Sequence, residues 1–129
     1  RYFPPQVSLQ QLQRLDNGQW QTQLRIQSFS TGSVNYQNLS LKIQFQDLEW
    51  VMLSAPAPIQ IGPSNAEIVT VDLSIPANIQ SVLSERLNKS QSIRYVLTGQ
   101  LDSTEPKEIY TLDYQGRLNP APGLDGVFR

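Results

Sequence analysis

The stretch that decides the fold is LSLKIQF at residues 39–45, in which apolar and polar side chains alternate without a break. An extended chain points successive side chains to opposite sides, so the four apolar residues share one face and the three polar residues share the other. A strand with one apolar and one polar face is typical of an antiparallel sheet that has a core on one side and water on the other.

The same two-residue period recurs on both sides of this stretch. The further alternating runs are Val7 to Gln11, Trp20 to Gln27, Glu67 to Ile75, Ile93 to Leu101 and Glu108 to Leu118, and Glu49 to Ser54 is a shorter strand. In the first run Val7, Leu9 and Gln11 are the in-phase positions, and Asn17-Gly18 is a strong turn signal before the second. We therefore expect an all-β fold with one helix: an antiparallel β-sandwich of about seven strands, immunoglobulin-like or fibronectin-III-like.

One segment breaks the strand period. After Pro76, four apolar residues follow helical spacing as far as Asn88, and together they form one stripe over about three turns. They are Ile79, Val82, Leu83 and Leu87. The sequence therefore predicts one amphipathic helix, whose single apolar stripe the sandwich covers.

The chain divides into three parts by pattern. Residues 1–5 contain Pro4-Pro5 and are expected to form an extended, solvent-facing tether. Residues 6–118 form the domain, and residues 119–129 lack periodicity and are expected to be an extended or mobile tail. Within the domain, Ala55-Pro56-Ala57-Pro58 is expected to prevent regular strand pairing, since proline donates no backbone hydrogen bond.

Composition excludes several classes of function. The 129 residues include no Cys and no His, which removes thiolate nucleophiles, imidazole bases and the usual zinc ligands. The formal charge of −1 comes without a basic cluster, so we expect no binding to nucleic acid. No apolar run approaches the ~20 residues of a membrane-spanning helix.

Few residues suggest catalysis. Asp102 and Asp113 lie on neighbouring predicted strands. They would be either the paired carboxylates of a glycosidase or two solvated acids at strand ends, and we prefer the second interpretation. Ser28, Ser30 and Ser33 have no activating partner and suit turns. Three other acids, Asp47, Glu67 and Asp72, lack the spacing of a calcium loop. We expect no enzyme activity and no cofactor, and we assign no catalytic, cofactor-binding or metal-ligating residue.

The aromatic side chains have two possible roles. They would form a platform for glycans or apolar ligands, or they would fill the core. Four of them are in phase with inward-facing Leu and Ile, which favours the core: Trp20, Tyr95, Tyr110 and Tyr114. Trp50 and Tyr36 remain open between the two roles.

Several segments together resemble a known family. They are Val7 to Leu12 after a double proline, Leu39 to Phe45, Ala66 to Ile75 running into Pro76, the helix through Leu87, Ile93 to Leu101, and Ile109 to Leu118. In this order, over about Pro5 to Leu118, the chain resembles the late embryogenesis abundant group 2 (LEA-2, or WHy) domains, in their bacterial lipoprotein form. It departs from the family at Ser28-Phe29-Ser30, where an Asn-Pro-Asn type turn is usual, and at residues 53–58, where a Gly-rich stretch is usual.

The resemblance implies a function and a location. Members are associated with water stress and are thought to bind or shield other macromolecules, and the bacterial ones are often lipidated at a Cys upstream of a proline-containing tether. We therefore expect a non-catalytic, monomeric periplasmic module, anchored to the outer membrane by a lipid upstream of Arg1, which binds a protein or another macromolecule. The start at Arg1 without a Met fits a mature chain from which a signal peptide has been removed. For function, the alternative is a structural adaptor lipoprotein of a secretion or envelope machine, which binds one protein partner. For location, the alternative is the cytoplasm.

Overall fold

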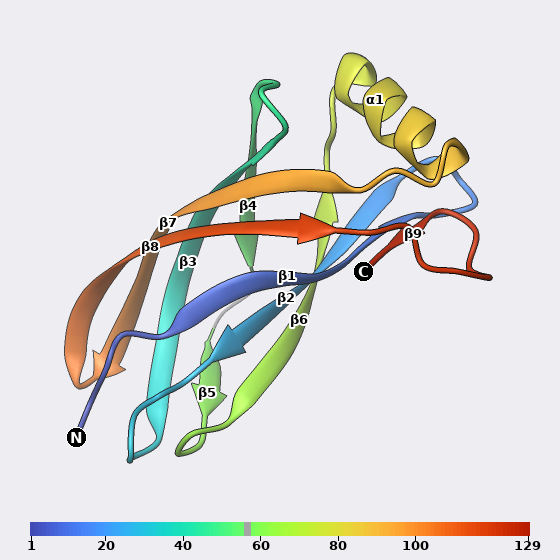
Figure 1. Cartoon of the computed structure of the whole chain (residues 1–129). Helices are drawn as coiled ribbons and strands as arrows, with labels where there is room; N and C mark the ends of the chain where they lie inside the picture. The colour runs from blue at the N-terminus through green and yellow to red at the C-terminus, as the bar shows by residue number, and fades with distance from the viewer. Residues whose placement is uncertain (56–57) are drawn as a thin grey trace.

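The computed structural model describes residues 1–55 and 58–129, with the side chains of 54 and 55 left aside. Within these ranges the chain forms nine strands and one helix (Figure 1). The strands are β1 (Gln6–Arg14), β2 (Trp20–Gln27), β3 (Val34–Phe45), β4 (Trp50–Ala55), β5 (Ile59–Ile61), β6 (Ala66–Leu73), β7 (Ile93–Glu105), β8 (Lys107–Leu118) and β9 (Val127–Phe128), and the helix is α1 (Ala77–Asn88).

The strands form two antiparallel sheets packed face to face. One sheet has the order β6-β2-β1-β9, and the other has the order β4-β3-β7-β8 with β5 also paired to β3. The expected all-β sandwich with one helix is confirmed. The expected number of about seven strands is too low, because β5 and β9 span three and two residues and are too short to show a period.

The alternating patterns correctly identify the core faces. In β3 the side chains of Leu39, Leu41, Ile43 and Phe45 are at most 2% exposed. The in-phase apolar side chains of β2 and β7 are buried in the same way and join one cluster between the sheets, while Thr22 is a buried polar residue and Gly99 is half-buried. Burial of this continuous apolar layer is the main stabilising contribution to the fold.

The first strand departs from its predicted phase. A β-bulge between Leu9 and Gln11 inserts Gln10, so that Leu9 pairs with Leu24 while Gln11 pairs with Gln23. The inserted residue shifts the period by one position, which turns Gln11 outward and places Leu12 in the core with no exposed surface. The expectation that Gln11 faces inward is wrong for this reason.

Tyr95 of β7 joins the two sheets. Its hydroxyl accepts a hydrogen bond from the backbone N–H of Leu9 at 3.1 Å, beside the bulge of β1. The ring lies over Gly116, its register partner on β8, where a Cβ atom would come within 2.6 Å of the ring. Burial raises the pKa of Tyr95, and the bond from Leu9 acts in the opposite direction. The tyrosine therefore fills the corner of the sandwich and satisfies a buried backbone donor there.

The helix closes one end of the sandwich (Figure 1). Of the predicted stripe, Ile79 and Leu83 are fully buried and Leu87 packs against the core, while Val82 is only half-buried. Pro76 precedes the first turn, and its carbonyl accepts hydrogen bonds from the N–H groups of Ile79 and Gln80. The predicted helix is confirmed.

The C-terminal residues are not the extended tail that the sequence suggested. Val127 and Phe128 pair with Gln13 and Leu12 of β1, and Phe128 is completely buried in the core. Asn119 and Arg129 exchange two backbone hydrogen bonds of 2.8 Å, which hold the returning segment in place. A single aromatic anchor after an aperiodic loop leaves no periodic signal, so the sequence pattern missed it.

The N-terminal residues are also attached to the domain. The N–H of Phe3 donates to Ser30 Oγ at 2.9 Å, and the N–H of Thr31 donates to the carbonyl of Arg1. Tyr2 and Phe3 are exposed, but Pro5 is buried, so the prediction of a solvent-facing tether is wrong at Pro5. Pro56 and Ala57 lie outside the described residues; they belong to the proline-rich break expected at residues 55–58.

Among the described residues, no helix is long and apolar enough to cross a membrane.

Replacing Tyr95 tests the link between the sheets. Tyr95→Phe leaves the buried N–H of Leu9 without a partner, so we expect the free energy of unfolding to fall by about 1–3 kcal/mol in urea denaturation. Tyr114→Phe is the control, because its half-buried ring lies 6.1 Å from that of Tyr95 and no side-chain hydrogen bond of its hydroxyl is found among the described residues. Equal losses in the two variants would contradict the role given to the hydroxyl.

Replacing Phe128 tests the C-terminal anchor. Phe128→Ala opens a cavity beside Leu12, and we expect it to reduce the free energy of unfolding by about 3–5 kcal/mol. Leu124→Ala, in the same segment but 45% exposed, should change stability by no more than about 0.5 kcal/mol. A free C-terminal tail would instead tolerate both changes equally.

Candidate functional site

The two acids considered for catalysis do not face each other. Asp102 of β7 lies opposite Ile109, and Asp113 of β8 lies opposite Thr98. Four residue positions therefore separate them along the strands, about 13 Å at the usual strand rise. That separation exceeds the carboxylate spacing of retaining or inverting glycosidases.

The serines serve the loop between β2 and β3. Ser28 and Ser30 are fully buried, and the N–H of Ser30 donates to Ser28 Oγ. Ser30 Oγ in turn accepts the bond from Phe3, while Ser33 is exposed. In the described ranges, no three acidic, His or Cys side chains gather in a way that would hold a metal ion.

The aromatic residues divide between core and surface. Trp20, Tyr36 and Tyr95 are buried, and Tyr110 and Tyr114 pack against the core while partly exposed. The core role is therefore confirmed for the four in-phase residues and also holds for Tyr36. Trp50 is 39% exposed on the outer side of β4, where the ammonium of Lys42 lies 4.6 Å from its ring centre.

The outer side of the four-stranded sheet is dominated by glutamine. Six of the sixteen glutamines of the chain lie on β1 and β2 and form three directly opposed pairs. The pairs are Gln6 with Gln27, Gln11 with Gln23, and Gln13 with Gln21. The bulge at Gln10 is what brings Gln11 and Gln13 to this side. We call these six residues the glutamine face.

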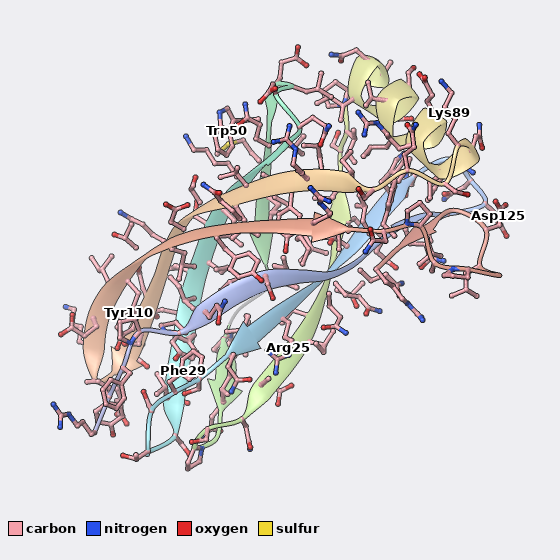
Figure 2. The ribbon with its side chains drawn as sticks, in the orientation of Figure 1. Arg25, Phe29, Trp50, Lys89, Tyr110 and Asp125 are labelled. Carbon is pink, nitrogen blue, oxygen red and sulfur yellow. The ribbon has the colours of Figure 1, made fainter. Side chains whose placement is uncertain are left out.

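Hydrogen bonds order the side chains of this face. Gln11 Nε2 donates to Gln13 Oε1 at 3.3 Å, and Gln21 Nε2 donates to the carboxylate of Asp72 on β6 at 3.2 Å. Arg25, labelled in Figure 2, lies between the pairs and donates to Gln27 Oε1 at 2.7 Å. Arg129 Nε also donates to Gln11 Oε1 at 3.0 Å. Four of the six glutamines are therefore engaged, partly with charged neighbours, and no side-chain hydrogen bond of Gln6 or Gln23 is found among the described residues.

The chemistry available to the glutamine face is hydrogen bonding without ionisation. Each carboxamide has two donor hydrogens and an oxygen with two lone pairs, more than the internal bonds use. Five of the six side chains are half-exposed and Gln6 is exposed, so the remaining donors and acceptors meet solvent. Carboxamides do not titrate, and contacts made by this face will not depend on pH.

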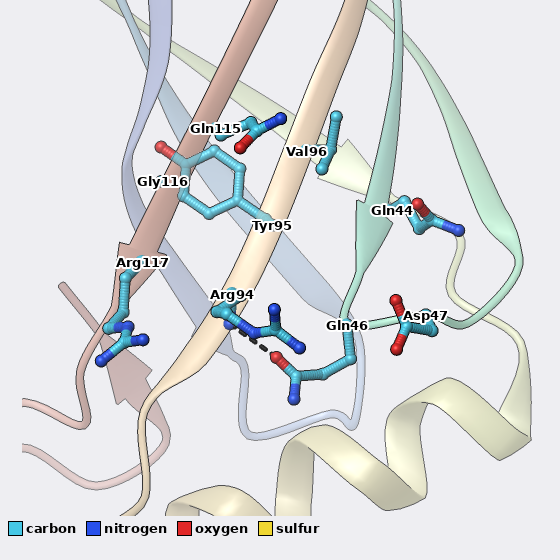
Figure 3. A pocket seen from close by; sticks show the side chains of 9 residues that line it. All are labelled: Gln44, Gln46, Asp47, Arg94, Tyr95, Val96, Gln115, Gly116 and Arg117. Atoms are coloured by element: carbon cyan, nitrogen blue, oxygen red, sulfur yellow. Dashed lines mark hydrogen bonds between the residues drawn. The ribbon is translucent and has the colours of Figure 1, made fainter.

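A polar pocket of about 360 Å³ lies on the outer side of the other sheet (Figure 3). Arg94 of β7 and Arg117 of β8 line it as direct register partners, and Gln46 and Asp47 line it from the turn after β3. Gln46 has a left-handed backbone (φ 54°), and its Oε1 accepts a hydrogen bond from the N–H of Arg94 at 2.8 Å. The pocket is open and cationic, and it lies on the opposite side of the sandwich from the glutamine face.

Sequence reasoning identified part of these surfaces. The alternation from Trp20 to Gln27 places Gln21, Gln23, Arg25 and Gln27 on one polar face, because alternation determines the side of a strand. Sequence reasoning did not find the opposing glutamines of β1, whose phase the bulge changes, or the arginine pair, which depends on strand register.

Comparisons with known proteins support the fold alone. No family model matches the chain, and no curated protein matches it. Among solved structures, the chain is similar to AT1g01470 from Arabidopsis thaliana at 12% identity, with a TM-score of 0.58 over 92% of this chain and 81% of that one. A protein from Archaeoglobus fulgidus aligns at 7% identity and a TM-score of 0.49, over 94% and 98% of the two chains.

Proposed function

We propose that this domain is a non-catalytic binding module that shields other macromolecules, and that the glutamine face is the surface that does so. The observation that carries the proposal is the set of three opposed glutamine pairs on β1 and β2. A solvated sheet face is more commonly interspersed with Lys and Glu, which remain strongly hydrated. This face replaces most of those charges with carboxamides.

The physical basis is the exchange of hydrogen bonds. Polar groups on a macromolecule lose their water partners when water becomes scarce, and unpaired donors and acceptors are costly. An ordered layer of amides offers both donors and acceptors at the spacing of the strands, about 4.8 Å apart across the sheet. Because four of the six side chains already make hydrogen bonds within the protein, less of their side-chain entropy is lost on binding.

The resemblance to LEA-2 domains over residues 5–118 supports the same function, since that family is associated with water stress. It also supports a location in the bacterial envelope, and we propose that the native protein is a periplasmic lipoprotein of the outer membrane. Mass spectrometry of the native protein should then find an acylated Cys upstream of Arg1. Finding an unmodified, Met-initiated chain in the cytoplasm would contradict the proposed location but not the shielding role.

A second candidate function is that of an adaptor for one protein partner. The observation that favours it is the edge strand β4, which has no charged residue and exposes Trp50 and Met52, the latter by 68%. Uncharged edge strands readily pair with another chain. A single stoichiometric envelope partner would establish the adaptor role. Its binding should be lost in Met52→Arg and retained in Ile109→Arg, which lies on the opposite edge strand.

A triple substitution tests the glutamine face. We expect Gln13→Ala, Gln21→Ala and Gln23→Ala together to lower the protection of a drying-sensitive dehydrogenase by about half, because three of six carboxamides are lost. The readout is enzyme activity recovered after drying and rehydration with an equal mass of each variant. Circular dichroism melting checks that the variants remain folded.

The matched control removes three exposed glutamines elsewhere, Gln60, Gln91 and Gln100. This control keeps the composition equal and should protect as well as the wild type. Equal losses in both triple variants would mean that total amide content matters and the face does not.

A further inference from the structure

Two of the seven arginines have no protein partner for their guanidinium groups among the described residues. The five engaged ones donate to side chains, donate to a backbone carbonyl, or stack on a ring: they are Arg1, Arg14, Arg25, Arg86 and Arg129. The two others are Arg94 and Arg117. The same two lie directly opposite each other on neighbouring strands.

This arrangement is electrostatically unfavourable by itself. Residues directly opposite on an antiparallel pair have Cβ atoms about 4.5–5.5 Å apart, and like charges there are destabilising. Asp47 is the only acid that lines the pocket, and no ion pair connects it to either arginine in the described part of the chain. Two cations and one carboxylate therefore line the pocket, and neither arginine is paired with that carboxylate in the described part of the chain.

The rest of the pocket supplies neutral donors. Three side-chain amides line it, those of Gln44, Gln46 and Gln115. Gln46 is fixed from both sides, because its N–H donates to the carbonyl of Arg94 and its Oε1 accepts from the N–H of Arg94. Its Nε2 hydrogens remain as donors, as Figure 3 allows the reader to follow.

We propose that Arg94 and Arg117 form an oxyanion site that takes a phosphate group. In Figure 3 the Arg94 side chain points toward Gln46 and Asp47, and the Arg117 side chain lies apart from it. Both are long, exposed side chains on register-paired residues, so they can turn toward one anion between the strands. Two guanidinium groups suit the several oxygens of a tetrahedral, multiply charged anion better than the two oxygens of one carboxylate. The phosphate group comes either as inorganic phosphate or as part of a lipid headgroup. This site is separate from the glutamine face, so it neither requires nor contradicts the shielding role.

The proposal predicts opposite effects of one substitution with and without ligand. Arg117→Gln relieves the repulsion, so without phosphate its melting temperature should equal or exceed that of the wild type. Phosphate should raise the melting temperature of the wild type only, since a ligand stabilises the state that binds it. Measurements at constant ionic strength, with chloride replaced by phosphate, separate binding from screening.

The direct test is titration of labelled protein with inorganic phosphate, followed by amide chemical shifts. We expect saturable shifts at residues 94–96 and 115–117, and affinity at least about fivefold lower in both Arg94→Gln and Arg117→Gln. Arg25→Gln is the matched control: it makes the same charge change on the opposite sheet and should keep the wild-type affinity. A second arm measures cosedimentation with vesicles of phosphatidylglycerol against vesicles of phosphatidylcholine.

The outcomes are distinct. Phosphate binding without vesicle binding identifies a soluble phosphate, and vesicle binding that requires both arginines identifies a lipid headgroup. Shifts that are equal in Arg25→Gln, Arg94→Gln and Arg117→Gln, or the absence of both phosphate and vesicle binding, would overturn the site. Neither result bears on protection during drying, so this inference and the proposed function fail separately.

Discussion

The hydrogen bond between Leu9 N–H and the Tyr95 hydroxyl is the contact on which the corner of the sandwich depends. Leu9 lies at the bulge of β1, and β9 pairs only with residues 12 and 13 of that strand, so the N–H of Leu9 has no strand partner on that side. A buried donor without a partner is costly. Tyr95 satisfies it from the other sheet, and Gly116 leaves the space that the ring needs.

The bulge beside this bond also determines what the domain presents to solvent. Without the inserted Gln10, the phase of β1 would place Leu12 outside and Gln11 inside. With it, Leu12 enters the core and Gln11 lies opposite Gln23. Thr22 Oγ1 donates to the carbonyl of Gln11 at 2.7 Å and stabilises the strand just after the inserted residue. The polar face of the sheet therefore depends on the same local irregularity that the tyrosine supports.

The sequence predicted the parts of the fold that are periodic over several residues. Leu39 to Phe45 and the helical stripe that includes Ile79 each repeat often enough for the period to determine the buried side. The return of Phe128 has no such repeat, since one aromatic residue anchors the whole segment. The surfaces were harder to predict, because alternation determines a side but not a register. The adjacency of Arg94 and Arg117 follows from how β7 and β8 align, which no single strand encodes.

The two outer surfaces differ in the physics of any contact they make. Contacts of the glutamine face are neutral, short-ranged and insensitive to salt and pH, because amides carry no charge. Contacts of Arg94 and Arg117 involve charge, extend over a Debye length of about 8–10 Å and weaken as salt increases. The core of the sandwich separates the two sides, so an anion held by the arginines leaves the amide layer free. Under the two proposals, one side of the domain takes an anionic group while the other side contacts a different macromolecule.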